Sequence, residues 1–370
     1  MLDWFRKVDY KLFISVLALS IFGIIMIYSA SMYTAGLQYN DAFYHVKKQA
    51  LSLVVGLIFA LIVSRVDLKL LLKYKYLILA VSIILLALVF VPFLSVSKYG
   101  ATRWINIGVG TIQPSELSKF GLAIFLAGYL HDKDMRKLKY IFTALAICMV
   151  FALLIMLEPN MSITICVVLV VVILLFASGV KWQFFVAMAL PALAVGALLI
   201  IMEPYRWDRI IAFLDPWKYP KAEGYQLIQS YYALGSGGFF GVGLFNSRQK
   251  YLFLPFAESD FIFSIIGEEL GFVGGFIMLA LCMYIIFRGI VIAINAEDRY
   301  LSLLTVGLIS VFAVQVILNI AVVSGAVPPT GLPLPYVSAG GSSIIAFWCS
   351  LGLLLNISYE KPRTLNILRP

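Results

Sequence analysis

Residues 261–287 read FIFSIIGEELGFVGGFIMLALCMYIIF, and within these 27 residues only Glu268 and Glu269 carry a charge. An α-helix needs about 20 apolar residues to cross the roughly 30 Å of hydrocarbon in a bilayer, because each residue advances it by about 1.5 Å. This run is long enough to span a membrane. It therefore predicts a membrane helix rather than a helix in the core of a soluble protein.

The rest of the chain repeats this composition. Of its 370 residues, 62% are hydrophobic and only 13% are charged, whereas a soluble domain carries about 25% charged residues. We predict one all-α polytopic membrane domain over residues 1–370, with about ten transmembrane helices. The other nine apolar runs are Leu12–Ala30, Ala50–Ser64, Tyr76–Phe93, Leu117–Leu130, Tyr140–Leu157, Met161–Val180, Trp182–Met202, Leu301–Val323 and Gly341–Ile357. The first run is too long for a typical signal-peptide core, so we expect it to be retained as a helix.

Lysine and arginine predict the orientation of these spans. With the N-terminus inside, the segments on the inner side hold 17 basic residues and the short outer segments hold 5. Positive residues favour the cytoplasmic side, so both termini should be cytoplasmic. The net charge of +9 then reflects topology, and we expect no nucleic-acid binding.

Three polar, turn-rich segments fall on the outer face in this topology. The longest is Glu203–Asp260, between the seventh and eighth spans, and its many aromatic residues predict a packed, structured extracytoplasmic loop. Ser97–Gln113 and Ser324–Ser343 lie on the same side. Their convergence indicates a site on the outer face.

Ionisable residues at membrane depth are costly, so they are candidates for function. Glu116 and Lys119 are three residues apart and share one helix face; they either line a substrate cavity or anchor a helix end as an ion pair. Asp260 should lie at the outer mouth of its span, with Glu268 deeper on the same face. The alternatives are a helix N-cap for Asp260 and a structural buried carboxyl for Glu268.

Two further stretches have both a functional and a structural interpretation. Arg206 and Arg209 could bind a phosphate group or pair with loop carboxylates. The Gly- and Pro-rich residues 331–343, which include Ser342, line a cavity or form a rigid turn. The cysteines and histidines lack metal-ligand spacing, so we predict no protein-built metal site.

Several motifs resemble one known family, the SEDS proteins (shape, elongation, division and sporulation), whose branches include FtsW, RodA and SpoVE. The resemblance covers nearly the whole chain and rests on Gly100-Ala101-Thr102-Arg103-Trp104-Ile105, Gln113-Pro114-Ser115-Glu116, Gly224-Tyr225-Gln226, Gln249-Lys250, Asp260-Phe261-Ile262-Phe263, Glu268-Glu269-Leu270-Gly271 and Gly331-Leu332-Pro333-Leu334-Pro335. The run Asn246–Lys250 is more similar to FtsW and SpoVE than to RodA. Asn160 stands where the family usually has Asp.

The resemblance implies a peptidoglycan glycosyltransferase in the bacterial cytoplasmic membrane, with its active site facing outside. Such an enzyme polymerises lipid II into undecaprenyl-linked glycan and acts with a class B penicillin-binding protein, a transpeptidase. The family's essential carboxylate maps onto Asp260, and its Glu and Lys map onto Glu116 and Lys119. The motifs favour septal division or sporulation over elongation.

We expect Asp260 to accept the proton of the attacking sugar hydroxyl. Cations should stabilise the leaving diphosphate, and the candidates are Arg103, Lys119, Arg206, Arg209, Arg248 and Lys250. A divalent cation, Mg²⁺ or Mn²⁺, would share that task. The rival hypotheses are a lipid II flippase and a non-catalytic scaffold for the transpeptidase.

Overall fold

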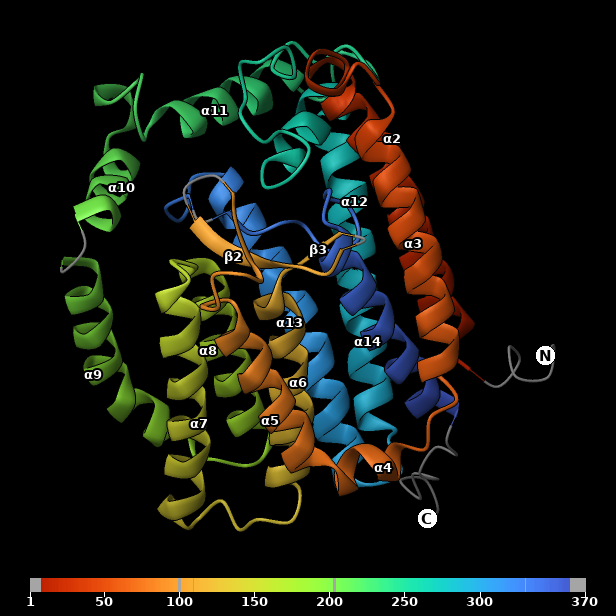
Figure 1. Cartoon of the computed structure of the whole chain (residues 1–370), viewed down its shortest axis with the longest axis vertical. Coiled ribbons are helices and arrows are strands. Elements are labelled where there is room, and N and C mark those ends of the chain that lie inside the picture. Colours follow the sequence, from red (N-terminus) through yellow and green to blue (C-terminus); the bar gives the residue numbers. More distant parts are fainter. Residues whose placement is uncertain (1–7, 99–100, 109, 202–203, 330, 360–370) are drawn as a thin grey trace, which may run out of the picture.

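The computed structural model describes residues 8–98, 101–108, 110–201, 204–329 and 331–359, and most of them are helical (Figure 1). The principal helices are α2 (Tyr10–Tyr39), α3 (Tyr44–Val63), α5 (Lys75–Leu88), α6 (Pro114–Leu130), α7 (Leu138–Leu157), α8 (Met161–Ala177), α9 (Trp182–Ile201), α12 (Ile262–Ile294), α13 (Arg299–Val323) and α14 (Gly341–Tyr359). Each of the ten predicted runs coincides with one of them. The terminal basic residues used for orientation, Arg6, Lys7, Lys361, Arg363 and Arg369, lie outside the described residues.

Six of these helices are long and apolar enough to cross a membrane: α2, α3, α7, α12, α13 and α14. The helices α5 and α8 and the segment Trp182–Leu198 of α9 are apolar but shorter. A chain with this many apolar helices is a multi-pass membrane protein. The beginning of α2 and the end of α14 lie together, since the amide of Asp9 donates to Ser358 Oγ over 3.0 Å. They are at the end of the bundle that also holds the short helix α4 (Leu68–Lys73) (Figure 1).

The opposite end carries a cap built from the long connection between α9 and α12. It contains α10 (Pro204–Leu214), the 3₁₀ turn η1 (Pro216–Lys218) and α11 (Tyr225–Gly237) (Figure 1). The side chain of Leu227 in α11 is 1% exposed and that of Ala233 is fully buried. The prediction that this connection is packed is therefore confirmed.

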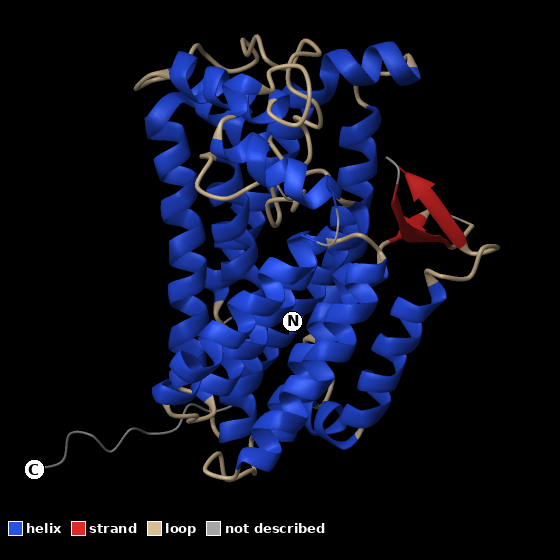
Figure 2. Ribbon diagram, turned by 90° about the vertical axis from the view of Figure 1, so that its left-hand side faces the viewer, coloured by secondary structure: helices blue, strands red, loops and turns tan. Residues whose placement is uncertain are grey.

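The all-α prediction did not include the short strands found within residues 95–112, most of which belong to the turn-rich segment Ser97–Gln113. This connection folds into an antiparallel sheet of β1 (Ser95–Lys98), β2 (Ala101–Asn106) and β3 (Thr111–Ile112), in the order β1-β2-β3. Ser95 pairs with Ile105, and Ile105 pairs with Ile112. Thr, Ile and Trp favour strands because their side chains pack on a pleated surface. The sheet lies beside the bundle, nearer the end that carries the cap (Figure 2).

The helix α12 is broken at Gly271, which has φ 67° and ψ −165°. The break interrupts the helical hydrogen bonds, and the Gly-rich loop after α11 replaces them. Phe272 N donates to Gly238 O over 3.0 Å, and Val242 N donates to Glu268 O over 3.0 Å. Backbone that leaves a helix inside a membrane protein needs such internal partners. The loop and the kink therefore depend on one another.

The middle of α2 crosses the irregular connection between α13 and α14 at Gly23. A β-carbon on Gly23 would lie 2.6 Å from the carbonyl oxygen of Tyr336 and 2.7 Å from Val337 Cα. Only a residue without a side chain permits this approach. The connection consequently lies level with the middle of α2, well inside the bundle.

Gly23→Ala should destabilise the protein by about 1–3 kcal/mol, because the added methyl group would overpack against backbone atoms that cannot rotate away. The matched control is Gly36→Ala in the same helix, where an added β-carbon meets nothing within 4 Å. That variant should be neutral or more stable by up to about 1 kcal/mol, because alanine favours helices. Thermal unfolding in detergent measures both, and equal melting temperatures would contradict the close crossing.

Candidate functional site

Asp260 lies at the end of the turn that leads into α12, two residues before the helix begins. Its side chain is half-buried, and Ser259 Oγ donates to its Oδ1 over 2.9 Å. The backbone of Gly331 borders the carboxyl, since a β-carbon there would be 3.1 Å from Asp260 Oδ2. The carboxyl therefore has a fixed wall on one side and a hydroxyl donor on another.

The surroundings of Asp260 shift its acidity toward neutral pH. Burial raises the pKa of the carboxyl to about 6, and the nearby Glu258 raises it further, while Ser259, Arg103 and Arg209 act in the opposite direction. A carboxyl with this pKa is mostly ionised at pH 7 and is a stronger proton acceptor than an ordinary aspartate. Such a shift is typical of a catalytic base.

Two arginines provide positive charge near this carboxyl. Arg103 in β2 donates through Nε to the carbonyl oxygen of Glu158 over 3.1 Å and through Nη2 to that of Pro159. Arg209 in α10 donates through Nη1 to the carbonyl oxygen of Pro329 over 3.0 Å. Backbone carbonyls thus hold both guanidinium groups, and both arginines lie close enough to Asp260 to lower the pKa of its carboxyl. The structure brings together three of the predicted site residues here.

Glu116 and Lys119 form a buried ion pair at the beginning of α6. Lys119 Nζ lies 2.9 Å from Glu116 Oε2, and the two side chains are 1% and 2% exposed. Lys119 also donates to Gln315 Oε1 over 2.5 Å, and Ser343 Oγ donates to Glu116 Oε2 over 2.6 Å. The adjacent Ser342 Oγ accepts from the amide of Gln113 over 3.3 Å. These residues join α6, α13 and the beginning of α14.

Residues 331–340 connect α13 to α14 as irregular backbone, and side chains from the surrounding helices bind them. Gln315 Nε2 donates to Pro333 O over 2.8 Å, and Gln49 Nε2 in α3 donates to Ser338 O over 3.0 Å. Ser338 Oγ donates to Ser259 O over 2.6 Å. The connection is thereby tied to the turn that carries Asp260.

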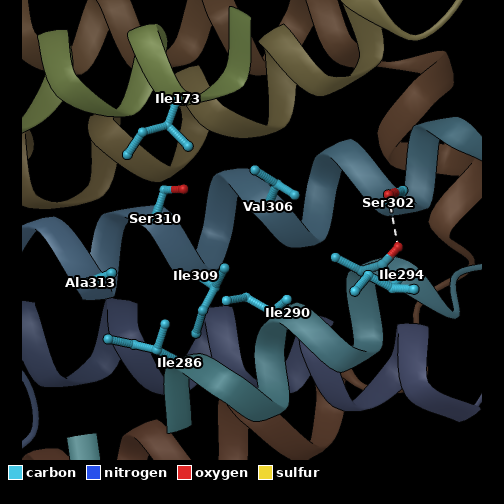
Figure 3. Close-up of a pocket in the computed structure, with 10 residues that line it drawn as sticks. Ile173, Ile286, Ile290, Ile294, Ser302, Val306, Ile309, Ser310 and Ala313 are labelled. Atoms are coloured by element: carbon cyan, nitrogen blue, oxygen red, sulfur yellow. Dashed lines mark hydrogen bonds between the residues drawn. The ribbon is translucent and has the colours of Figure 1, made fainter. Parts of the chain in front are cut away.

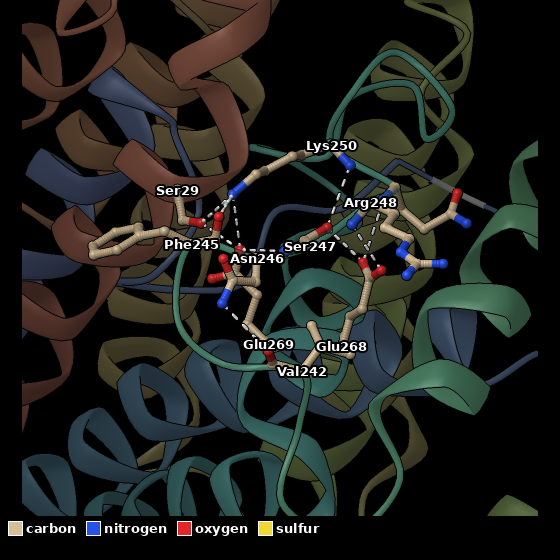
Figure 4. A network of polar contacts seen from close by, with 10 residues as sticks. Ser29, Val242, Phe245, Asn246, Ser247, Arg248, Lys250, Glu268 and Glu269 are labelled. Carbon is tan, nitrogen blue, oxygen red and sulfur yellow. Dashed lines mark hydrogen bonds and ion pairs between the residues drawn. The ribbon is translucent and has the colours of Figure 1, made fainter.

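A second polar cluster contains Glu268, Glu269 and Lys250 (Figure 4). Glu268 accepts from Ser247 Oγ and from the amides of residues 248 and 249. Glu269 lies 3.1 Å from Lys250 Nζ, and both side chains are fully buried. Lys250 Nζ also donates to the carbonyl oxygen of Phe245.

This second cluster fixes the loop 245–250 against the first half of α12. The structural alternative for Glu268, a buried carboxyl with internal partners, therefore describes its position better than substrate contact does. The same applies to Lys250, which is 1% exposed. Arg248 differs, because its backbone is bound to Glu268 and its side chain is exposed. Arg206 belongs to α10, but its side chain lies outside the described residues.

Sequence reasoning missed several residues around Asp260. Gln315 and Asn319 lie four residues apart in α13 and bind the 331–340 connection. Two amide side chains on one face of an apolar helix are a usable signal, because polar residues in membrane spans face the protein interior. Glu158, whose carbonyl oxygen accepts from Arg103 Nε, was also missed.

Glu158 is a buried acid at the turn between α7 and α8. Its side chain is fully buried, and no hydrogen bond to its carboxyl oxygens meets ordinary distance and angle criteria. Burial raises the pKa of this carboxyl to about 8, although Ser115 and Arg103 act in the opposite direction. At pH 7 the carboxyl of Glu158 is therefore mostly protonated and neutral.

An apolar cavity of about 350 Å³ lies between α8, α12 and α13, toward the opposite end of the bundle (Figure 3). Ile173, Ile286, Ile290, Val306 and Ile309 form most of its wall, with Ser310 beside them. No acid, base or cation lines it, so it has no chemical groups for a reaction. Within the described parts of the chain, no three His, Cys, Asp or Glu side chains gather as a metal site would require.

Comparison with known proteins gives consistent matches along the whole chain. The family model FTSW_RODA_SPOVE, described as a cell cycle protein, matches residues 10–363. Stage V sporulation protein E of Bacillus subtilis is 39% identical over 353 residues, covering 95% of this chain and 96% of that protein. A probable peptidoglycan glycosyltransferase FtsW of Geobacter sp. (strain M18) is 38% identical and covers 95% and 98%.

Solved structures share the fold. A chain from a peptidoglycan synthase complex, described as coordinating polymerization and crosslinking, matches with a TM-score of 0.79 and 29% identity, covering 95% of this chain and 97% of that one. The crystal structure of the Rod shape determining protein RodA from Thermus thermophilus matches with a TM-score of 0.71 and 27% identity, covering 96% and 97%.

Glu158→Gln should stabilise the protein at alkaline pH. The native carboxyl keeps its proton up to a pH of about 8, whereas an unfolded glutamate loses it near pH 4.3. The native state therefore binds more protons in this window, and wild-type stability falls as pH rises from about 4.3 to 8. Glutamine has no proton to lose. Its melting temperature should exceed that of wild type at pH 8.5 and match it near pH 4.5.

The control for this comparison is Glu297→Gln, which changes an exposed glutamate. It should show no such pH-dependent difference. A Glu158→Gln variant whose melting temperature differs from wild type equally at both pH values would contradict the buried, protonated carboxyl.

Proposed function

The chain belongs to the FTSW_RODA_SPOVE family of cell cycle proteins, and from this premise we propose that it is a peptidoglycan glycosyltransferase with Asp260 as its catalytic base. It polymerises lipid II into β-1,4-linked glycan strands. The observation that carries the assignment of Asp260 is its half-buried carboxyl, whose pKa is raised to about 6 beside two arginines.

The proposed topology is a single domain of ten spans with both termini in the cytoplasm. It adds α5, α6, α8 and α9 to the six long helices. An even number of spans agrees with the proximity of Asp9 and Ser358, and the basic residues favour the cytoplasm for that end. The cap formed by residues 204–260 and the carboxyl of Asp260 then face the outside of the bacterial cytoplasmic membrane.

The reaction transfers one sugar between two lipid-linked substrates. The 4-hydroxyl of the acceptor GlcNAc attacks C1 of the donor MurNAc, its proton passes to Asp260, and the bond from C1 to the diphosphate oxygen breaks. The bonding electrons leave with the lipid diphosphate, so this group needs no proton. Attack from the opposite face converts the α-linked donor into a β-linked product. A positioned base typically contributes about 10²–10⁴-fold to such a step.

The leaving diphosphate gathers negative charge, which nearby cations stabilise. Arg103 and Arg209 are the best placed because they already act on Asp260 electrostatically. The exposed Arg248 is a third candidate, and Arg206 remains a candidate from sequence. A divalent cation carried by the substrate diphosphate would share this task.

The remaining predicted residues act less directly in this proposal. Glu116, Lys119 and Ser342 form the inner wall below the reacting groups. Glu268 and Lys250 hold the outer loop and support the site without contacting substrate. We also propose a class B penicillin-binding protein as the partner, since a structural match comes from a peptidoglycan synthase complex. Relatives named FtsW and SpoVE support a role in division or sporulation.

Asp260→Asn should abolish polymerisation, with a loss of at least about 10²-fold, because the amide keeps the shape of the carboxyl but cannot accept the proton. The assay supplies lipid II to the reconstituted chain together with a class B penicillin-binding protein of the same bacterium and measures glycan length. Asp41→Asn, at an outer acid paired with Lys47 over 2.8 Å, is the control and should keep wild-type activity.

Glycan synthesis by Asp260→Asn at the wild-type rate would refute the base. If the wild type made no glycan from lipid II already exposed to the assay solution, a flippase or a scaffold would explain the family membership better.

The pH dependence of kcat/KM should show an acidic limb near pH 6. The carboxyl of Asp260 accepts a proton only when ionised, and its pKa is raised to about 6, so activity should fall as pH drops through that value. An ordinary aspartate would place this limb near pH 4. A limb near pH 4 in the wild type would contradict the assignment of this carboxyl as the base.

A further inference from the structure

The side-chain amide of Asn319 in α13 bridges two segments of irregular backbone. Its Nδ2 donates to the carbonyl oxygen of Asp260 over 2.8 Å and to that of Leu332 over 2.7 Å. The residue is 1% exposed. Because both partners are acceptors, the amide must present its nitrogen to them, which fixes its orientation. One side chain therefore joins the base to the connection beside it.

These two carbonyl groups need donors for a physical reason. Neither belongs to a helix or a sheet, and a buried carbonyl without a partner costs free energy comparable to a lost hydrogen bond. Asn319 supplies both bonds from a regular helix, which is more rigid than either loop. The two hydrogen bonds consequently fix the positions of Asp260 and Leu332 relative to the helix α13.

The bond to the Leu332 carbonyl matters because the preceding residue, Gly331, lies beside the carboxyl of Asp260. Gly331 has φ 75°, and a β-carbon built on it would lie 3.1 Å from Asp260 Oδ2. The backbone of Gly331 thus forms the wall against which the carboxyl rests. By binding the carbonyls of both Asp260 and Leu332, Asn319 fixes the position of the Asp260 carboxyl and of the Gly331 backbone beside it.

One helical turn below, Gln315 repeats this arrangement. It donates to Pro333 O over 2.8 Å and accepts from Lys119 over 2.5 Å. The connection is therefore held at two successive levels by the same face of α13. Gln315 is linked through Lys119 to the ion pair with Glu116, and Asn319 is linked to Asp260.

We propose that Asn319 is a positioning residue for Asp260, which rests on the proposed role of Asp260 as the base. It places the carboxyl at the depth where protein atoms partly desolvate it and where a sugar hydroxyl can still reach it. Without the amide, the turn would relax toward water. The carboxyl would then be both misplaced and more acidic.

The test compares Asn319→Leu, which keeps the size of the side chain and removes both donors, with wild type in the lipid II assay with the partner transpeptidase. A misplacement of about 1 Å can cost roughly 10²-fold in rate. We expect kcat to fall by about that factor while KM for lipid II stays within about twofold. The acidic limb of the pH profile should move below pH 6, because a solvated carboxyl is more acidic.

A matched control exists at the opposite end of the bundle. Asn356 in α14 is also buried, and its Nδ2 donates to the carbonyl oxygens of Val63 and Val66 over 3.5 and 2.6 Å. Asn356→Leu removes the same kind of bridge far from Asp260. It should leave kcat per folded protein and the pH profile unchanged, even if the melting temperature falls.

A second variant tests the wall without removing any hydrogen bond. Gly331→Ala would press a methyl group toward Asp260 Oδ2, and it should lower kcat more than the control Gly179→Ala. Gly179 also has a positive φ, 95°, but an added β-carbon there meets nothing within 4 Å. If Asn319→Leu does not insert into the membrane, the comparison of Gly331→Ala with Gly179→Ala still tests whether the position of the Asp260 carboxyl matters for kcat.

The outcomes separate the two proposals. If Asp260→Asn is active, the proposed base itself is wrong. If Asp260→Asn is inactive but Asn319→Leu and Gly331→Ala keep wild-type kcat and the same acidic limb, the positioning role is wrong. An equal loss of kcat in Asn319→Leu and Asn356→Leu would also refute it, because both amides would then act only in folding.

Discussion

Irregular backbone inside a membrane bundle must find its hydrogen-bond partners within the protein, and the outer half of this chain depends on that constraint. The turn before α12 and the 331–340 connection satisfy one another: Ser338 Oγ donates to Ser259 O over 2.6 Å, and Ala339 N donates to Glu258 O over 2.9 Å. Amide side chains from α3 and α13 supply further donors. The hydrogen bonds that satisfy the backbone of these two irregular segments therefore also fix the position of the Asp260 carboxyl.

The two polar clusters use charge in different ways. Around Glu268 and Glu269, carboxylates accept from the loop 247–250, and the desolvation cost of the ions is offset by several hydrogen bonds. Glu268, Glu269 and Lys250 each have partners within the cluster, so this cluster holds one loop conformation against the broken helix at Gly271. Around Asp260 the carboxyl is half-buried instead. The carboxyl of Asp260 is therefore partly accessible from outside the protein, whereas those of Glu268 and Glu269 are enclosed and stabilise the fold.

The sequence predicted the helices well because apolar runs of sufficient length have few alternatives in a membrane. It failed where the outcome depends on contacts between distant segments. The strands within residues 95–112 form because three short segments meet, and Lys250, a predicted substrate-binding residue, lies in an ion pair. Its partner Glu269 could not be identified without the fold. Asn319 was overlooked because a neutral amide scarcely changes the apolarity of its helix, although its spacing from Gln315 was visible in the sequence.

The acidity of the Asp260 carboxyl is a consequence of its position in the structure. Burial raises the pKa of Asp260 while Arg103 and Arg209 lower it, and the balance lies near 6. If the carboxyl moved toward solvent, burial would no longer raise its pKa and it would be a weaker base. If it moved deeper into the protein, it would keep its proton at neutral pH and could not accept another. The useful range of depth is therefore narrow. A loop alone is too mobile to hold a group within such a range, which is why attachment of that loop to the rigid axis of α13 has chemical as well as structural consequences.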